Sequence, residues 1–175
     1  MTSKKIIAFA GSSSQNSINK KLASYAAHLF ENATVEVLDL NDYEMPIYSS
    51  DREKESGVPQ KAVAFFTKIS EADIIVLSLA EHNGAYATAF KNIFDWVSRY
   101  NNKFFQQKPL LLLATSPGPR GGMTVLEIAK ERFPRHDAQL MGTFSLPSFN
   151  DNFQEGKISN ALLNTQLKEI IASFS

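Results

Sequence analysis

Apolar positions follow two patterns that alternate along the chain. Short, nearly continuous apolar runs predict buried β-strands, and they occupy Lys4–Ala10, Thr34–Leu40, Asp73–Ala80, Leu110–Thr115 and Gln139–Phe144. Longer segments with apolar residues three or four positions apart predict helices, and they occupy Ser17–Glu31, Val58–Ser70, Tyr86–Tyr100, Gly122–Phe133 and Lys157–Phe174. A strand followed by a helix therefore occurs five times.

Strands that are apolar along their whole length are covered on both faces, so helices should pack on both sides of the sheet. Because strands and helices alternate, the strands should run parallel in one sheet. We predict an α/β fold with one domain, residues 1–175, built as a three-layer α/β/α sandwich. Its five-stranded parallel sheet would have the order 2-1-3-4-5, which is the flavodoxin-like arrangement.

Composition narrows the class of protein. The 175 residues are 43% hydrophobic, carry 18 Lys plus Arg against 18 Asp plus Glu, and include no cysteine. The balanced charge argues against a nucleic-acid partner, and the lack of cysteine excludes disulfides, thiolate metal sites and thiol nucleophiles. His28, His82 and His136 stand apart in the sequence, so we expect no metal site. No apolar run is long enough for a signal peptide or a membrane span, so we expect a cytoplasmic protein without a membrane partner.

Doubly wound sheets bind ligands beyond the carboxyl ends of their strands, where the strand order reverses. For the order 2-1-3-4-5 this point lies between strands 1 and 3, so the loops after the first, third and fourth strands are the candidate site. The connection Asn41–Gly57 is also notable, because its 17 residues exceed the usual length of an unstructured loop.

The first of these loops runs from Gly11 to Asn19 and reads GSSSQNSIN. It precedes a predicted helix, whose N-terminal N–H groups and dipole favour an anion. We therefore expect a phosphate group to be bound by Ser12, Ser14, Ser17, Ile18 and Asn19. The glycine patterns of a P-loop and of a dinucleotide-binding turn are both missing. A serine-rich turn with a helix N-cap is the alternative interpretation.

The other two loops suit a planar heterocycle and its side chain. Asn83–Gly84 predicts a sharp turn after the third strand, and the loop after the fourth strand combines two prolines, three glycines and Arg120. The ligand contacts expected here are Glu81, His82, Asn83, Gly84, Ser116, Pro117, Gly118, Gly121 and Gly122. Each loop taken alone is also compatible with an ordinary turn.

Three motifs in order carry a resemblance to a known family. Its first loop, G-S-x-R-x-x-S-x-N, is matched at Gly11, Ser12, Ser17 and Asn19. Its P-E-Y-N loop and the helix motif K-N-x-x-D-W are matched at Glu81, Asn83, Lys91, Asn92, Asp95 and Trp96. Its S-x-G-x-x-G-G loop is matched at Ser116, Gly118, Gly121 and Gly122, and Met45–Tyr48 is similar to its P-x-Y segment. Along essentially its whole length, the chain resembles the NAD(P)H-dependent FMN reductase family, which includes quinone and azo-dye reductases.

The resemblance implies FMN as the cofactor and NADPH or NADH as the electron donor. It implies transfer of hydride from the nicotinamide to FMN and on to an acceptor such as a quinone, an azo compound or free flavin, with no side chain acting as a nucleophile or acid. It also implies a homodimer or a dimer of dimers, with the helix Ala85–Tyr100 and the long connection near the interface. The alternative is a non-enzymatic protein, either an electron carrier or a flavin-free interaction module.

Two departures from the family motifs bear on this choice. Ser14 stands where the family has arginine, and His82 stands where it has tyrosine. Loss of the arginine removes a charge-assisted phosphate contact of about 1.5–3 kcal/mol, which supports the non-enzymatic alternative. Lys20 and Lys21 are the nearby cations that could compensate.

Overall fold

A five-stranded parallel sheet forms the centre of the computed structural model, which describes residues 3–174. Its strands are β1 (Lys4–Gly11), β2 (Ala33–Leu38), β3 (Ile74–Leu79), β6 (Pro109–Thr115) and β7 (Gln139–Leu146). They are hydrogen-bonded in the order β2-β1-β3-β6-β7, and every pair is parallel. The predicted order 2-1-3-4-5 is confirmed.

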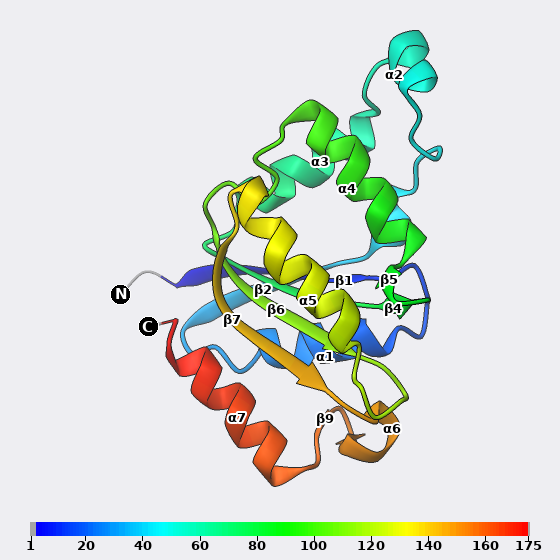
Figure 1. Ribbon diagram of the computed structural model, residues 1–175. Helices are drawn as coiled ribbons and strands as arrows, with labels where there is room; N and C mark the ends of the chain where they lie inside the picture. The colour runs from blue at the N-terminus through cyan, green and yellow to red at the C-terminus, as the bar shows by residue number, and fades with distance from the viewer. Residues whose placement is uncertain (1–2, 175) are drawn as a thin grey trace.

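Helices cover both faces of the sheet, as the apolar strands require (Figure 1). The longer ones are α1 (Ile18–Ala27), α3 (Gln60–Ser70), α4 (Thr88–Tyr100), α5 (Met123–Arg132) and α7 (Ala161–Ala172). Alternate residues of β1 serve the two faces: Ile7 and Phe9 join the core under α3, α4 and α5, whereas Ile6 and Ala8 join the core under α1 and α7. The three-layer α/β/α prediction is therefore confirmed.

Several short elements lie in the connections, and the apolar pattern predicted none of them. They are the 3₁₀ helices η1 (Leu40–Tyr43) and η2 (Phe133–His136), the helices α2 (Ser50–Ser56) and α6 (Phe149–Asn152), and the strands β4 (Glu81–His82), β5 (Ala85–Tyr86), β8 (Phe153–Gln154) and β9 (Lys157–Ile158). β4 pairs with β5 and β8 pairs with β9, so these four strands form two small antiparallel hairpins.

The long connection Asn41–Gly57 is not an unstructured loop, because it contains part of η1 and the whole of α2. The Ser49 side chain accepts a hydrogen bond from Arg52 N at 3.2 Å and so caps the start of α2, while Gly57, at φ 73°, ends it. None of the residues of α2 is buried, and the helix projects from the body of the protein (Figure 1). A helix without an apolar face has no periodic signal in the sequence.

The five longer helices begin one to four residues later than their apolar spacing predicted, and local contacts explain two of these shifts. The α4 helix starts at Thr88, because Tyr86 belongs to the β4–β5 hairpin. The α7 helix starts at Ala161, because the Asn160 side chain accepts a hydrogen bond from Leu163 N at 3.2 Å and caps the helix there. The longest helix in residues 3–174 is α4, with 13 residues, and no helix in this part of the chain is both long enough and apolar enough to cross a bilayer.

Candidate functional site

The three candidate loops start at neighbouring strand ends. Gly11, the last residue of β1, is in register with Leu79 at the end of β3, and Leu79 is in register with Ala114 of β6. From these ends the chain enters the loop before α1, the β4–β5 hairpin and the loop before α5 (Figure 1). The structure thus brings the site residues expected from the sequence to one edge of the sheet, where the strand order reverses.

The loop before α1 presents free backbone N–H groups to solvent. Ser13, Gln15 and Asn16 are exposed, and their N–H groups donate to no acceptor in residues 3–174. Ser14 is exposed too, and its N–H donates to Ser12 Oγ at 3.2 Å, which shapes the turn. Free N–H groups beside a helix N-terminus, where the dipole is positive, suit an anion.

The start of α1 is fixed by Ser17, which is nearly buried. Its Oγ accepts a hydrogen bond from Lys20 N at 3.1 Å, and its own N–H donates to Ser14 O at 3.2 Å. Ile18 follows as the first helical residue and is half-buried. The serine-rich turn with an N-cap is therefore present, and the exposed N–H groups lie in the same turn.

Asn19 differs from the other loop residues, because its side chain is committed to the fold. It is only 3% exposed. Its Oδ1 accepts hydrogen bonds from Ser78 Oγ at 2.7 Å and from Thr115 N at 3.1 Å, and its Nδ2 donates to Thr115 O at 3.2 Å. The side chain thus ties α1 to the ends of β3 and β6. Its contact with a phosphate stays a prediction, whereas these hydrogen bonds show that the Asn19 side chain positions the strand ends.

The β4–β5 hairpin carries the second set of candidates. His82 and Asn83 are exposed, and Asn83 and Gly84 form the turn at φ 52° and 74°. The Glu81 carboxylate accepts a hydrogen bond from Val125 N at 3.0 Å, so it is directed to the first turn of α5. The hairpin therefore offers His82, the Asn83 side chain and its turn to a ligand, while Glu81 fixes the hairpin against α5.

The loop between β6 and α5 is held by backbone contacts to the segment after β7. Phe149 N donates to Ser116 O at 3.0 Å, and Ser148 N donates to Gly118 O at 2.9 Å. Pro117 between them is exposed.

The two glycines before α5 are required by close packing. Gly121 is buried at φ 57°, and a Cβ there would lie 2.9 Å from the backbone of Leu146 and closer still to Ser145 Oγ. Gly122 has φ 75°, and its Cβ would meet that of Ala114 at 3.1 Å. These glycines let the loop lie tightly against β6 and β7.

The K-N-x-x-D-W motif on α4 holds the long connection in place. Asn92 Oδ1 accepts a hydrogen bond from Tyr48 N at 2.9 Å, and Asn92 Nδ2 donates to Met45 O at 3.1 Å and to Pro46 O at 3.2 Å. Trp96 Nε1 donates to the same Pro46 O at 2.7 Å, and the Tyr48 ring packs edge-on against Trp96. The sequence suggested no contact between the K-N-x-x-D-W motif and the Met45–Tyr48 segment, because 44 or more residues separate the bonded partners.

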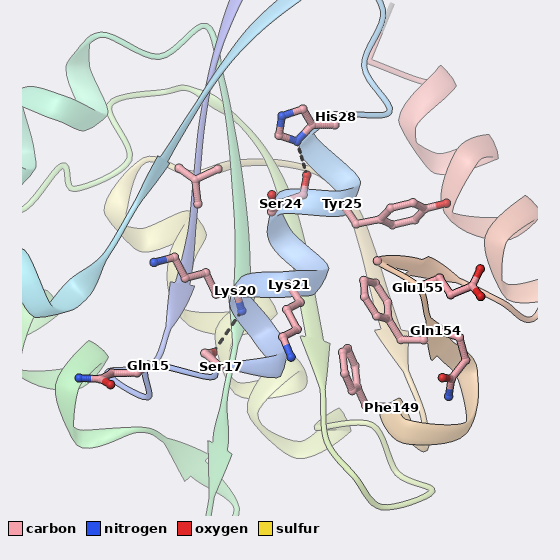
Figure 2. Close-up of a pocket in the computed structure, with 13 residues that line it drawn as sticks. Gln15, Ser17, Lys20, Lys21, Ser24, Tyr25, His28, Phe149, Gln154 and Glu155 are labelled. Carbon is pink, nitrogen blue, oxygen red and sulfur yellow. Dashed lines mark hydrogen bonds between the residues drawn. The ribbon is translucent and has the colours of Figure 1, made fainter.

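The two lysines that could replace the missing arginine lie in different surroundings. Lys20 Nζ forms an ion pair with Asp39 Oδ2 at 2.5 Å. This ammonium, followed by the N–H of Asn41, lowers the pKa of the Asp39 carboxyl. In residues 3–174 no carboxylate or hydrogen-bond acceptor pairs with the Lys21 ammonium, and this side chain extends on the side of α1 that faces Phe149 (Figure 2).

The Tyr86 hydroxyl and the His136 ring are buried polar groups that lie between α4 and α5, on the face of the sheet opposite α1. Burial raises the pKa of Tyr86 to about 12, and it lowers the pKa of His136. His136 Nδ1 lies 2.8 Å from Asn102 O, whereas His136 Nε2 and the Tyr86 hydroxyl are buried without a partner in residues 3–174. Both side chains are therefore neutral near pH 7.

The match to a protein family covers most of the chain: residues 4–151 fit the family described as NADPH-dependent FMN reductase. The chain belongs to this family. It is 25% identical over 179 residues to an NADPH:quinone oxidoreductase of Arabidopsis thaliana, covering 97% of this chain and 89% of that protein. It is 33% identical over 79 residues to a quinone reductase of Escherichia coli (strain K12), a match that spans 45% of this chain and 42% of that protein.

Among solved structures, the fold is similar to FerB, a flavoenzyme NAD(P)H:(acceptor) oxidoreductase from Paracoccus denitrificans. The TM-score is 0.76 at 22% identity, over 98% of this chain and 94% of that chain. The predicted family and flavodoxin-like fold are confirmed. The predicted class of enzyme, an FMN-dependent oxidoreductase that receives its electrons from NAD(P)H, is confirmed as well.

Proposed function

We propose that the loop before α1, the β4–β5 hairpin and the loop before α5 form the FMN site of this reductase. The observation that carries the proposal is the register of β1, β3 and β6, which starts all three loops at adjacent strand ends. Bound FMN would accept hydride from NAD(P)H and deliver electrons to a small acceptor. The chain's own residues would bind and orient that cofactor.

The phosphate would be held at the first loop by neutral donors. Ser13, Gln15 and Asn16 supply free N–H groups, and the exposed Ser14 supplies a hydroxyl. Ser12 and Ser17 would shape this turn, each through the hydrogen bond that its Oγ accepts. A site of this kind fits a phosphate monoester without a metal ion.

The ring would lie between the hairpin and the loop before α5. His82 and Asn83 are exposed on the hairpin, and the open side of Gly118, where the nearest atom to an added Cβ is 3.9 Å away, leaves room for close approach. Glu81 would fix the hairpin through its carboxylate, and Gly121 and Gly122 would let the loop before α5 pack closely, so that both walls of the site are held in place.

The acceptor we propose is a quinone, because two curated relatives carry quinone reductase or quinone oxidoreductase names. NADPH is the proposed donor, in line with the description of the family. Use of NADPH also fits a cytoplasmic enzyme, which we propose to be one domain over residues 1–175.

We further propose a homodimer in which α4 and the long connection lie near the interface. Ile47 and Tyr100 are large apolar residues of this region that stay exposed, at 65% and 49%. Sedimentation equilibrium would test the dimer, and a monomer at micromolar concentration would refute it.

The test of the proposed function is a flavin titration followed by a turnover assay. We expect added FMN to lose fluorescence on binding, and the loaded protein to oxidise NADPH faster when a benzoquinone is present. Ser14→Asp should abolish FMN binding, because a carboxylate would face the phosphate, whereas Ser56→Asp at the end of α2 should bind normally. FMN binding without NADPH oxidation would favour an electron carrier. No FMN binding by the folded wild type would refute the proposed site.

A further inference from the structure

A hollow of about 840 Å³ lies beside α1 and extends beyond the site described so far. One wall is the outer face of α1, and the other is α6 with the β8–β9 hairpin (Figure 2). We call it the α1 hollow and define it by Gln15, Lys21, Tyr25, Phe149, Phe153 and Glu155, which are among its lining residues. Its volume is in the range of small-molecule sites.

The α1 hollow is continuous with the proposed phosphate loop. Gln15 and Ser17 line the hollow and belong to the turn whose N–H groups would hold the FMN phosphate. From this turn the hollow extends along α1 as far as His28 at the other end of the helix. A group joined to the outer oxygen of that phosphate would therefore enter the hollow directly.

Charged groups stand on both walls and are free. Lys20 forms an ion pair with Asp39, so within residues 3–174 Lys21 is the lysine near the start of α1 whose ammonium is unpaired. Glu155 lies on the facing hairpin with φ 50°, exposed, and within residues 3–174 it has no cation or hydrogen-bond donor as a partner. An ammonium suits a second phosphate, and a carboxylate suits the hydroxyl groups of a ribose.

Aromatic side chains line the hollow between these charges. The rings of Phe149 and Phe153 stack with centroids 4.7 Å apart, and Tyr25 packs edge-on against Phe153 at 5.8 Å. The Tyr25 hydroxyl donates to Asn164 Oδ1 at 2.7 Å, which fixes the ring. Phe149 and Phe153 are only 5% and 9% exposed, so they support the half-buried Tyr25, whose ring is the aromatic surface that favours contact with a flat heterocycle.

We propose that the α1 hollow binds the adenosine monophosphate moiety of FAD, so that this chain accepts the dinucleotide as well as FMN. Lys21 binds the second phosphate, Glu155 accepts hydrogen bonds from the ribose, and the adenine lies against Tyr25. The inference rests on the proposed flavin site, because it needs the flavin phosphate at the first loop. It also gives the chain a charged contact to the cofactor that the loop lacks at Ser14.

The experiment compares the Kd of FMN and of FAD for the apo protein by fluorescence titration. We expect FAD to bind at least about tenfold more tightly than FMN, as one added charge-assisted contact implies. Lys21→Gln should weaken FAD at least about tenfold more than it weakens FMN. Lys54→Gln, on the projecting α2, should change neither Kd. AMP should compete with FAD and leave FMN binding in place.

Each contrary result has a distinct meaning. If FMN binds and FAD binds no more tightly, the inference fails and the proposed function stands. If FAD is preferred but Lys21→Gln and Glu155→Gln leave the ratio of the two Kd values unchanged, the adenylate lies elsewhere and the inference fails. If AMP displaces FMN, AMP takes the phosphate loop and the inference fails as well. If neither flavin binds to the folded protein, the proposed flavin site itself is wrong.

Discussion

Replacement of Asn19 by alanine tests whether this residue stabilises the fold or binds the cofactor. The Asn19 side chain makes three hydrogen bonds with groups of Ser78 and Thr115, and it is only 3% exposed. Asn19→Ala leaves these groups unpaired, and each unpaired buried group costs about 1–3 kcal/mol. The Ser78 hydroxyl can rotate, water can enter the vacated space, and alanine gains up to about 0.7 kcal/mol of helix propensity.

The expected net loss is therefore about 3 kcal/mol of unfolding free energy. For a domain of this length, that lowers Tm by roughly 6–12 °C. Urea unfolding at equilibrium should show a lower midpoint with an unchanged slope. Asn19→Asp keeps both acceptor contacts but sets an oxygen against Thr115 O, so it should also destabilise the protein. Asn16→Ala, exposed in the same turn, should stay within about 0.5 kcal/mol.

The same variants test the role in binding. At a temperature where Asn19→Ala is folded, its affinity for FMN should fall by less than the loss of a direct ligand contact would cause. The first-loop N–H groups, which would bind the phosphate, remain in this variant. The reasoning would be refuted by a variant that is as stable as the wild type and has lost FMN binding. Asn19 would then contact the phosphate directly.

Three other substitutions follow from the same geometry. Ser14→Arg should tighten FMN binding about tenfold or more by restoring a charge-assisted contact; an unchanged Kd in a fluorescence titration would place the phosphate elsewhere. Gly121→Ala should cost about 2 kcal/mol or more in urea unfolding, because its φ is 57° and its Cβ would lie 2.9 Å from the backbone of Leu146, whereas Gly57→Ala, with nothing within 4 Å of the added Cβ, should cost less. Burial lowers the pKa of His136 in the folded protein, so the unfolded chain binds the proton more readily, and stability should fall as pH drops from about 6.5 through the folded pKa. His136→Phe should flatten this part of a Tm-against-pH curve, and a curve that stays as steep as the wild type would assign the loss to other groups.

The sheet was predictable because its signal is local. A strand such as Asp73–Ala80 is apolar at nearly every position, so its burial on both faces follows from its own residues, and the structure places it at Ile74–Leu79. Alternation with helices then indicates a doubly wound sheet, for which 2-1-3-4-5 is one of the common strand orders. The meeting of the three candidate loops at one edge of the sheet was also predictable, since the carboxyl ends of parallel strands lie together there.

The rest depends on contacts between distant parts of the chain. The bonds of Asn19 to Thr115 join residues 96 positions apart, and those of Asn92 and Trp96 to Pro46 span 46 and 50 positions. No spacing rule relates such pairs. The polar helix α2 was missed because it has no apolar face, and the β8–β9 hairpin was missed because two-residue strands have no detectable period.

The family motifs contain two kinds of residue, which the structure separates by burial and by hydrogen bonding. Asn19, Glu81, Asn92 and Trp96 are engaged within the fold, and this chain keeps all of them.

The two motif positions at which this chain differs most in chemistry, Ser14 and His82, are both exposed at the proposed cofactor site. Changes at these two exposed positions leave the scaffold intact and alter what the site binds. The departures at Ser14 and His82 therefore argue for an altered preference among flavins and acceptors, and against loss of the reductase fold.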